Sequence, residues 1–137
     1  GKMVMKLING IIEPGIRISN YIIGSKKENI LNNLEDNYQI WERGDGFCIY
    51  TLDNFKLWFN VNGELVQIGV TKDFYGDFMS ICIGSTMKDV VNKFGGIEND
   101  GDVYAIPGIE GLCFELEDVD NWDELTAPIE WIYVYKC

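Results

Sequence analysis

The sequence predicts an α+β protein made of two tandem helix-plus-β-meander units, with their helices packed on one face of an antiparallel sheet. Two observations predict this class: a segment that occurs twice, and three apolar strand-like runs after each copy. At 137 residues, with 47% hydrophobic residues, the chain suits one domain with its own core. We therefore expect a single domain over residues 1–137, with repeat units at about 16–72 and 75–136.

The repeat aligns residues 21–34 with residues 81–94 without a gap, at an offset of 60 positions. Each copy has a short apolar segment, a glycine turn, and a serine (Ser25 or Ser85) that is expected to cap a helix. A Gly-Gly pair at 95–96 predicts the end of the second helix. The apolar residues expected to share one helix face are Ile30, Leu31 and Leu34 in the first copy and Val90, Val91 and Phe94 in the second.

Three strands are expected after the first helix, at residues 47–51, 55–61 and 65–71. The last two are separated by Asn62-Gly63, a pair that suits the positive φ angles of a tight hairpin turn. Because side chains alternate along a strand, one sheet face should receive Leu57, Phe59 and Val61.

After the second helix, strands are expected at residues 103–106, 112–116 and 129–135. The connection from Glu117 to Pro128 is long, acidic and contains Trp122. Connections of this length without structure of their own are usually functional or disordered. We therefore expect this connection to bind a partner.

Four aromatic residues of the expected strands are out of phase with the alternation of the core residues. The sequence allows two locations for them. They either lie on a sheet face or rim, where protein interfaces recruit aromatic rings, or belong to the core beneath the helices. The register that decides between these positions is not readable from the sequence. The residues are Trp58, Trp131, Tyr133 and Tyr135.

The charge of the chain is strongly negative, with 22 Asp and Glu against 11 Lys and Arg, a formal net charge of −11. Residues 98–130 contain 11 of those 22 acids and no Lys or Arg. Such a field attracts a basic partner and repels nucleic acid, although an acidic surface that only confers solubility is the alternative. The residues expected to bind the partner are Glu98, Asp100, Asp102, Glu117, Asp118, Asp120, Trp122, Asp123 and Glu124.

The chain has no histidine, so the commonest general base and metal ligand is missing. Four widely spaced cysteines form no C-x-x-C pair, which favours structural thiols over a zinc site or a nucleophile. The stretch 118–123 is a poor calcium loop, because it lacks the required glycine and a closing glutamate. We expect no catalytic residue, no metal and no cofactor, and a hydrolase that uses a carboxylate pair stays as a weak alternative.

The apolar runs are too short to span a membrane, and the first residues show no export signal. Together with the expected reduced cysteines, these features favour a cytoplasmic protein that contacts no membrane.

Two families resemble this chain in its motifs. The Ile-Gly-Ser helix start used at 23–25 and again at 83–85, each followed by a three-strand meander, resembles the units of beta-lactamase-inhibitor-like proteins. The fuller pattern resembles bacterial immunity proteins of contact-dependent growth-inhibition and related polymorphic toxin systems. The segments that carry this second resemblance are 55–68, Gly76, 83–86, 94–95 and 104–114.

The resemblance implies that the chain binds one cognate toxin domain, often a basic nuclease, and occludes its active site. Our leading hypothesis is therefore a cytoplasmic immunity protein that forms a stoichiometric complex with a basic toxin domain. The alternative is a non-catalytic small-ligand or peptide-binding or assembly module of the same architecture.

Overall fold

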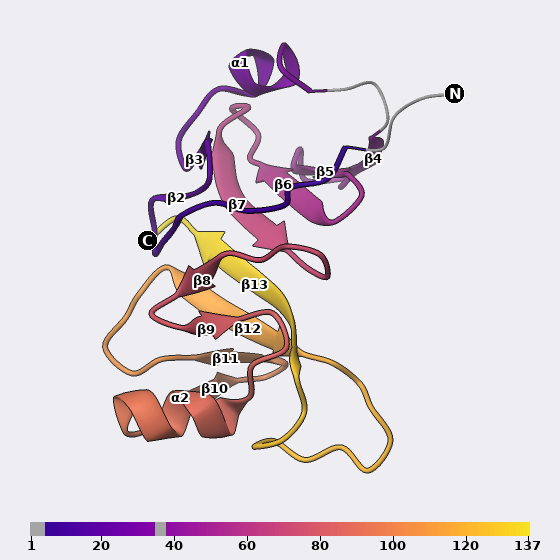
Figure 1. Ribbon diagram of the computed structural model, residues 1–137. Helices are drawn as coiled ribbons and strands as arrows, with labels where there is room; N and C mark the ends of the chain where they lie inside the picture. Colours follow the sequence, from indigo (N-terminus) through magenta and orange to yellow (C-terminus); the bar gives the residue numbers. More distant parts are fainter. Residues whose placement is uncertain (1–4, 35–37) are drawn as a thin grey trace.

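A long antiparallel sheet forms the framework of the protein (Figure 1). The computed structural model describes residues 5–34 and 38–137. Within these residues the sheet contains β4 (Gln39–Glu42), β5 (Cys48–Thr51), β6 (Phe55–Phe59), β7 (Leu65–Val70), β10 (Glu98–Asp100), β11 (Val103–Ala105), β12 (Leu112–Leu116) and β13 (Ile129–Tyr135). Their spatial order is β10-β11-β12-β13-β7-β6-β5-β4.

The sheet consists of two meanders that meet where their last strands pair. Val70 of β7 lies opposite Ile132 of β13, and Ile68 lies opposite Val134. All four side chains are fully buried. The six expected strands are present close to their expected bounds, whereas the edge strands β4 and β10 were not expected, because every residue in them is exposed and shows no alternation.

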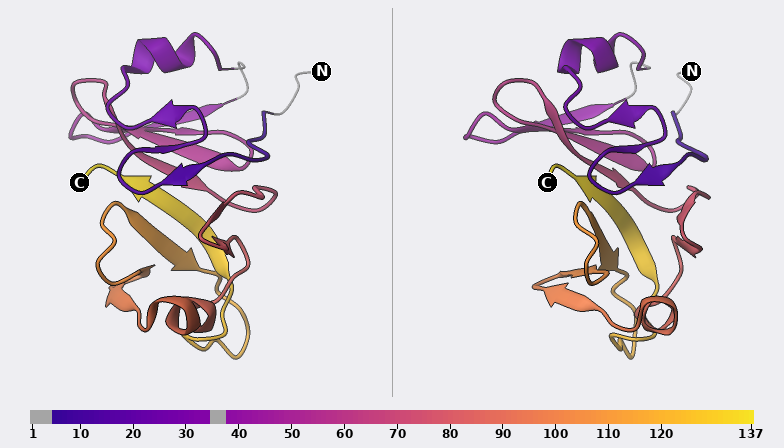
Figure 2. Two further views of the ribbon diagram at one scale, coloured as in Figure 1. Left: turned by 60° about the vertical axis from the view of Figure 1, so that its left-hand side comes forward. Right: turned by 90° about the vertical axis from the view of Figure 1, so that its left-hand side faces the viewer.

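The predicted α+β arrangement is wrong. The described residues are mostly β, with two short helices, α1 (Lys27–Leu31) and α2 (Met87–Phe94). The helices lie at opposite ends of the molecule in every view and form no layer over the sheet (Figures 1 and 2). The first helix is short because it has no side-chain cap and is followed directly by Asn32 and Asn33, which are poor helix formers.

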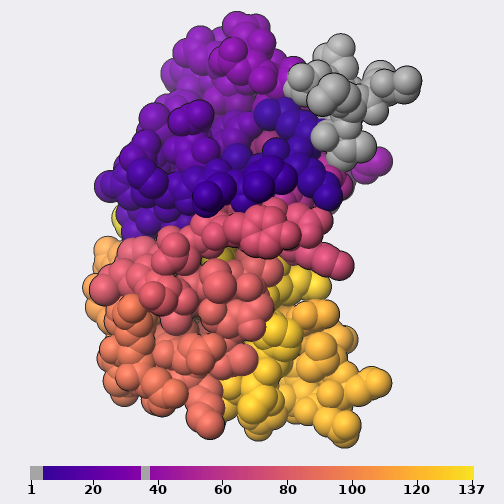
Figure 3. All heavy atoms as spheres, in the orientation of Figure 1, coloured from indigo at the N-terminus to yellow at the C-terminus, as the bar shows by residue number. Residues whose placement is uncertain are grey.

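Short strands cover most of the core face of the main sheet, and α2 adds only the buried Met87 and Val90. The short strands are β1 (Ile12–Glu13), β2 (Arg17–Ile18) and β3 (Tyr21–Ile22), which form one small sheet, and β8 (Asp77–Phe78) with β9 (Ile81–Cys82), which form a hairpin. The N-terminal segment and the β8–β9 region meet across the middle of this side of the molecule (Figure 3). They bury Ile12, Ile18 and Ile81 in the core. Strands of two residues have no readable periodicity, so the sequence did not predict them.

The internal repeat corresponds to a turn that docks on the last strand of each meander. Gly24 and Gly84 have φ angles of 93° and 91°, which favour glycine. The N–H of Gly24 donates to the carbonyl oxygen of Leu65 at 2.8 Å, and that of Gly84 donates to Ile129 at 2.9 Å. Each copy of the repeat therefore attaches at the first residue of β7 or β13.

The predicted helix caps are displaced by one residue. The N-cap residues are Lys26 and Thr86, where Ser25 and Ser85 were expected. The Thr86 side chain accepts a hydrogen bond from the N–H of Asp89, whose carboxylate accepts from the Thr86 N–H, so α2 begins with a capping box. It ends at a left-handed Gly95, as expected.

Alternation in the strands separates a buried face from an open face. Leu57 and Phe59 are buried as expected, but Val61 is 61% exposed because it lies in the turn beyond the end of β6. The four aromatic residues whose position was open are half-buried and lie outside the buried core, on the other face. The buried hydrophobic residues of the main strands are Cys48, Tyr50, Phe55, Leu57, Phe59, Leu65, Ile68, Val70, Tyr104, Leu112, Phe114, Ile129, Ile132 and Val134.

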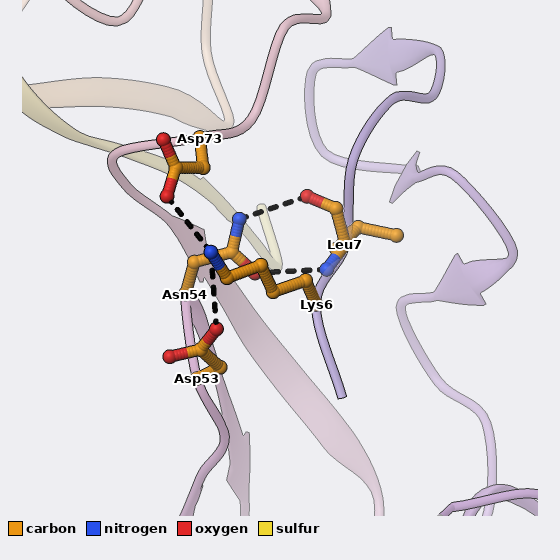
Figure 4. A network of polar contacts seen from close by, with 5 residues as sticks. All are labelled: Lys6, Leu7, Asp53, Asn54 and Asp73. Atoms are coloured by element: carbon orange, nitrogen blue, oxygen red, sulfur yellow. Dashed lines mark hydrogen bonds and ion pairs between the residues drawn. The ribbon is translucent and has the colours of Figure 1, made fainter. Parts of the chain in front are cut away.

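The start of the chain is held to the main sheet by Asn54 (Figure 4). The Asn54 amide oxygen accepts from the Leu7 N–H at 2.8 Å, and its amide nitrogen donates to the Leu7 carbonyl oxygen at 2.9 Å. Beside this pair, Lys6 Nζ lies 3.0 Å from Asp73 and 3.6 Å from Asp53. Residues 1–4, on which the expectation of no export signal partly depends, lie outside the described residues.

Because Asn54 is only 3% exposed, we expect Asn54→Ala to lower the free energy of unfolding by about 2 kcal/mol or more. The substitution leaves both backbone groups of Leu7 without their partner. Urea unfolding measures the change, and Asn92→Ala on the exposed surface of α2 is the matched control. Equal midpoints for the two variants would contradict the role of Asn54.

Candidate functional site

The open face of the sheet is lined by residues that the strand register places in rows. In one row, Asp100 lies opposite Val103, Val103 opposite Glu115, and Glu115 opposite Trp131. Residues directly opposite each other project to the same face of a sheet. The register therefore brings carboxylates and aromatic rings from β10, β12 and β13 onto one surface.

Aromatic rings pack against one another at the centre of this face. The Trp58 and Tyr133 centroids are 5.7 Å apart in an edge-to-face arrangement, and Tyr133 and Trp131 are stacked at 6.0 Å. Lys56 Nζ lies 4.8 Å from the centroid of Trp131. Gly69 makes the packing possible, because a Cβ there would lie 2.8 Å from the Tyr133 ring.

A groove of about 610 Å³ lies beside these rings, and we call it the sheet groove. Its small lining residues are Val103, Ala105 and Cys113 of β11 and β12, which lie between β10 and β13 in the strand order. The small side chains leave the space that larger ones would fill. The other lining residues are Trp58, Gln67, Glu98, Asn99, Asp100, Tyr104, Glu115, Tyr133 and Tyr135.

The negative charge of the sheet groove comes from its carboxylates. Burial and the nearby Glu115 raise the pKa of the Cys113 thiol to about 11. Burial and the hydrogen bond to Glu115 likewise raise the pKa of Tyr133, whose hydroxyl donates to Glu115 Oε1 at 2.8 Å. Both groups are therefore neutral at neutral pH, so they add no charge to that of Glu98, Asp100 and Glu115.

The acidic loop, residues 117–128, is held by its own hydrogen bonds. The N–H of Glu117 donates to the carbonyl oxygen of Pro128, which closes the loop at 2.8 Å. The Asp123 carboxylate accepts from the Leu125 N–H, and the Tyr104 hydroxyl donates to Glu124 Oε2 at 2.9 Å. These hydrogen bonds fix the conformation of the loop, so its exposed side chains form a defined surface.

The acidic loop and the adjacent turn form a second pocket of about 310 Å³. It contains three predicted residues, Asp102, Asp118 and Trp122, and the Trp122 residue is 47% exposed. This pocket shares Tyr104 and Glu115 with the sheet groove. The two hollows are therefore neighbours. We call the part of the molecule formed by residues 98–130, to which both hollows belong in large part, the acidic end.

The structure divides the nine predicted binding residues into groups. Glu98 and Asp100 line the sheet groove, but Glu117 lines a separate pocket with Lys72. The Asp123 and Glu124 carboxylates accept hydrogen bonds from the Leu125 N–H and the Tyr104 hydroxyl. Asp120 is exposed. Glu115 was not among the predicted residues, because only the register across four strands shows that it faces both hollows. Its spacing of two residues from Cys113 was the available signal.

The acids of residues 98–130 have no ion-pair partner among the described side chains. The ion pairs that these side chains form are Lys6 with Asp53 and Asp73, Arg17 with Glu13, and Arg43 with Asp45. Burial, and then repulsion by Glu115, Glu117 and Asp118, raises the pKa of Glu130. The acidic end therefore carries negative charge that the fold does not neutralise.

No group of three or more Cys, Asp or Glu in the described part of the chain is arranged to hold a metal ion. All four cysteines are free thiols. Neither helix in residues 5–34 and 38–137 has the length and apolar character needed to cross a bilayer.

Comparison with known proteins gives structural neighbours only. No protein-family model and no curated protein matches the chain. The crystal structure of the uncharacterized protein YfeY from Escherichia coli aligns with a TM-score of 0.57 at 13% identity, over 94% of this chain and 97% of YfeY. At this identity the likeness shows a shared fold and nothing about activity.

A second neighbour is an extracellular protein containing a SCP domain from Bacillus anthracis str. Ames, with a TM-score of 0.49 and 14% identity. The match covers 92% of this chain and 50% of that protein. YfeY is described as uncharacterized, so the resemblance to immunity proteins stays a prediction.

The raised pKa of Glu130 predicts how stability changes with pH. An acid whose pKa is higher in the folded state makes the fold less stable as pH rises through the range between its unfolded and folded pKa values. We expect Glu130→Gln to raise the melting temperature at pH 7 and to make little difference at about pH 3, where the native carboxyl is also neutral. Thermal unfolding at the two pH values measures this, with Glu42→Gln as control. An equal increase in melting temperature at both pH values would show that the charge of Glu130 does not cause the increase.

Proposed function

We propose that this chain is a non-catalytic protein that binds and neutralises a basic protein domain, as an immunity protein does for a cognate toxin domain. The observation that carries the proposal is the acidic end, whose carboxylates have no cationic partner among the described side chains. An aromatic surface lies directly beside it. The absence of histidine from the sequence favours binding over catalysis.

A nuclease is the target class that this surface fits best. Proteins that hold phosphate backbones do so with lysine and arginine, so a nuclease active site presents a positive groove. Exposed carboxylates such as Asp118 and Asp120 attract that groove and accelerate association. Bound there, the chain excludes the nucleic-acid substrate.

The aromatic residues supply the part of the interface from which water is removed. Large rings near the centre of an interface usually carry much of the binding energy. Trp122 on the acidic loop and the ring cluster at the centre of the open face provide such anchors. The four free thiols suit a protein that acts in the reducing cytoplasm.

A small-ligand or peptide-binding module is the second candidate. The sheet groove, at about 610 Å³, has the size of a small-molecule site and combines aromatic walls with a few polar groups. Such a ligand would protect the fold from heat at saturating concentration without any basic protein present.

The test uses the domain encoded immediately upstream of this chain's gene. We expect Asp118→Lys with Asp120→Lys to slow association with that domain by about tenfold or more at low salt, with a smaller difference at high salt. Stopped-flow kinetics across a salt series measures the rates, and protection of growing cells measures neutralisation.

The matched control is Glu28→Lys with Glu42→Lys, which changes the charge equally on exposed residues outside 98–130. Unchanged rates for the first pair of substitutions, or equal losses for both pairs, would contradict the role of the acidic end.

A further inference from the structure

The sheet groove has carboxylates on two sides of a row of small residues. Glu98 lies opposite Ala105, and Asp100 lies opposite Val103, so both acids of β10 face the groove beside a small side chain. Glu115 lies on the other side of Val103. A cationic group seated over β11 would therefore have carboxylates on both flanks.

Glu115 is the best-positioned of these acids. Its Oε1 atom accepts the hydrogen bond from Tyr133, which fixes the carboxylate beside the ring and leaves Oε2 to accept from a ligand. Because the groove is partly enclosed, a charge-assisted hydrogen bond there is stronger than one on an open surface. No lysine or arginine lines the groove among the described residues.

The open face already holds one cation over an indole ring. Lys56 Nζ lies 4.8 Å from the centroid of the Trp131 ring. Trp131 itself lies directly opposite Glu115 in the strand register. Trp58, Tyr133 and Tyr135 offer further ring surfaces at the groove itself. Aromatic rings attract cations electrostatically, and guanidinium groups most often occupy such positions.

We propose that the sheet groove receives an arginine side chain of the basic partner, with Glu115 as its principal carboxylate. The identity of the partner rests on the proposed function. A guanidinium group is planar, stacks on aromatic rings and presents paired donors to a carboxylate, whereas an ammonium group does not. The groove therefore selects arginine over lysine.

The probe is the peptide acetyl-Gly-Arg-Gly-amide, compared with its lysine and citrulline counterparts on the full chain. Citrulline keeps the shape of arginine but has no charge. We expect weak binding of the arginine peptide, with a Kd of the order of 1 mM, and about tenfold weaker binding of the lysine and citrulline peptides. Amide chemical shifts of Val103, Cys113 and Glu115 report the site.

Two variants test the role of the groove. Glu115→Gln should weaken binding of the arginine peptide about tenfold, whereas Glu42→Gln, which removes the same charge from an exposed residue outside the groove, should have little effect. Ala105→Leu fills the groove without a change of charge and should weaken binding at least as much as Glu115→Gln does. This second variant keeps the test valid if Glu115→Gln disturbs the fold.

Equal binding of the arginine peptide and either the lysine or the citrulline peptide, or equal losses in Glu115→Gln and Glu42→Gln, would overturn the arginine site. Capture of the upstream basic domain is measured in parallel on the same proteins. Capture of that domain without selective peptide binding removes the arginine site and leaves the proposed function in place. Selective peptide binding without capture removes the proposed function alone.

Discussion

The pairing of β7 with β13 is the interaction on which the rest of the structure depends. It joins the last strands of the two meanders and makes one continuous sheet from two smaller ones. Its buried side chains, Ile68, Val70, Ile132 and Val134, belong to the core, and the residues between them face the opposite surface. The same register that buries those four residues therefore also sets the positions of Gly69 and Tyr133, and with them the ring cluster of the open face.

The sequence predicted those parts of the fold that have a visible period and a clear boundary. The strands at 112–116 and 129–135 were predicted to the residue, because apolar positions alternate in them and turns or loops surround them. The helices were over-predicted, since apolar spacing alone could not show that α1 ends after five residues. Nor could it show that extended segments around Ile12 and Ile81 cover the core face, because strands of two residues carry no period.

The sequence predicted the negative charge of the candidate site, but it did not predict which residues line its groove and pocket. Counting acids between residues 98 and 130 identified the negative end of the molecule. The count could not separate Asp118, which lines a pocket, from Asp123, whose carboxylate holds the acidic loop in place. Glu115 was overlooked for a related reason: its importance arises from its neighbours on three other strands, and a single strand does not reveal them.

The position of β13 also constrains how the chain reaches its folded state. This strand is the last of the eight to be synthesised, yet it lies fourth in the spatial order, between β12 and β7. While it is still inside the ribosome, each meander has an unpaired edge, and the side of β7 that will face β13 is open to solvent. Contacts between distant parts of a chain form slowly, and the single core cannot close until β13 has paired with both β12 and β7. Until β13 is in place, the facing edges of β7 and β12 are therefore the parts of the sheet at which another chain could pair.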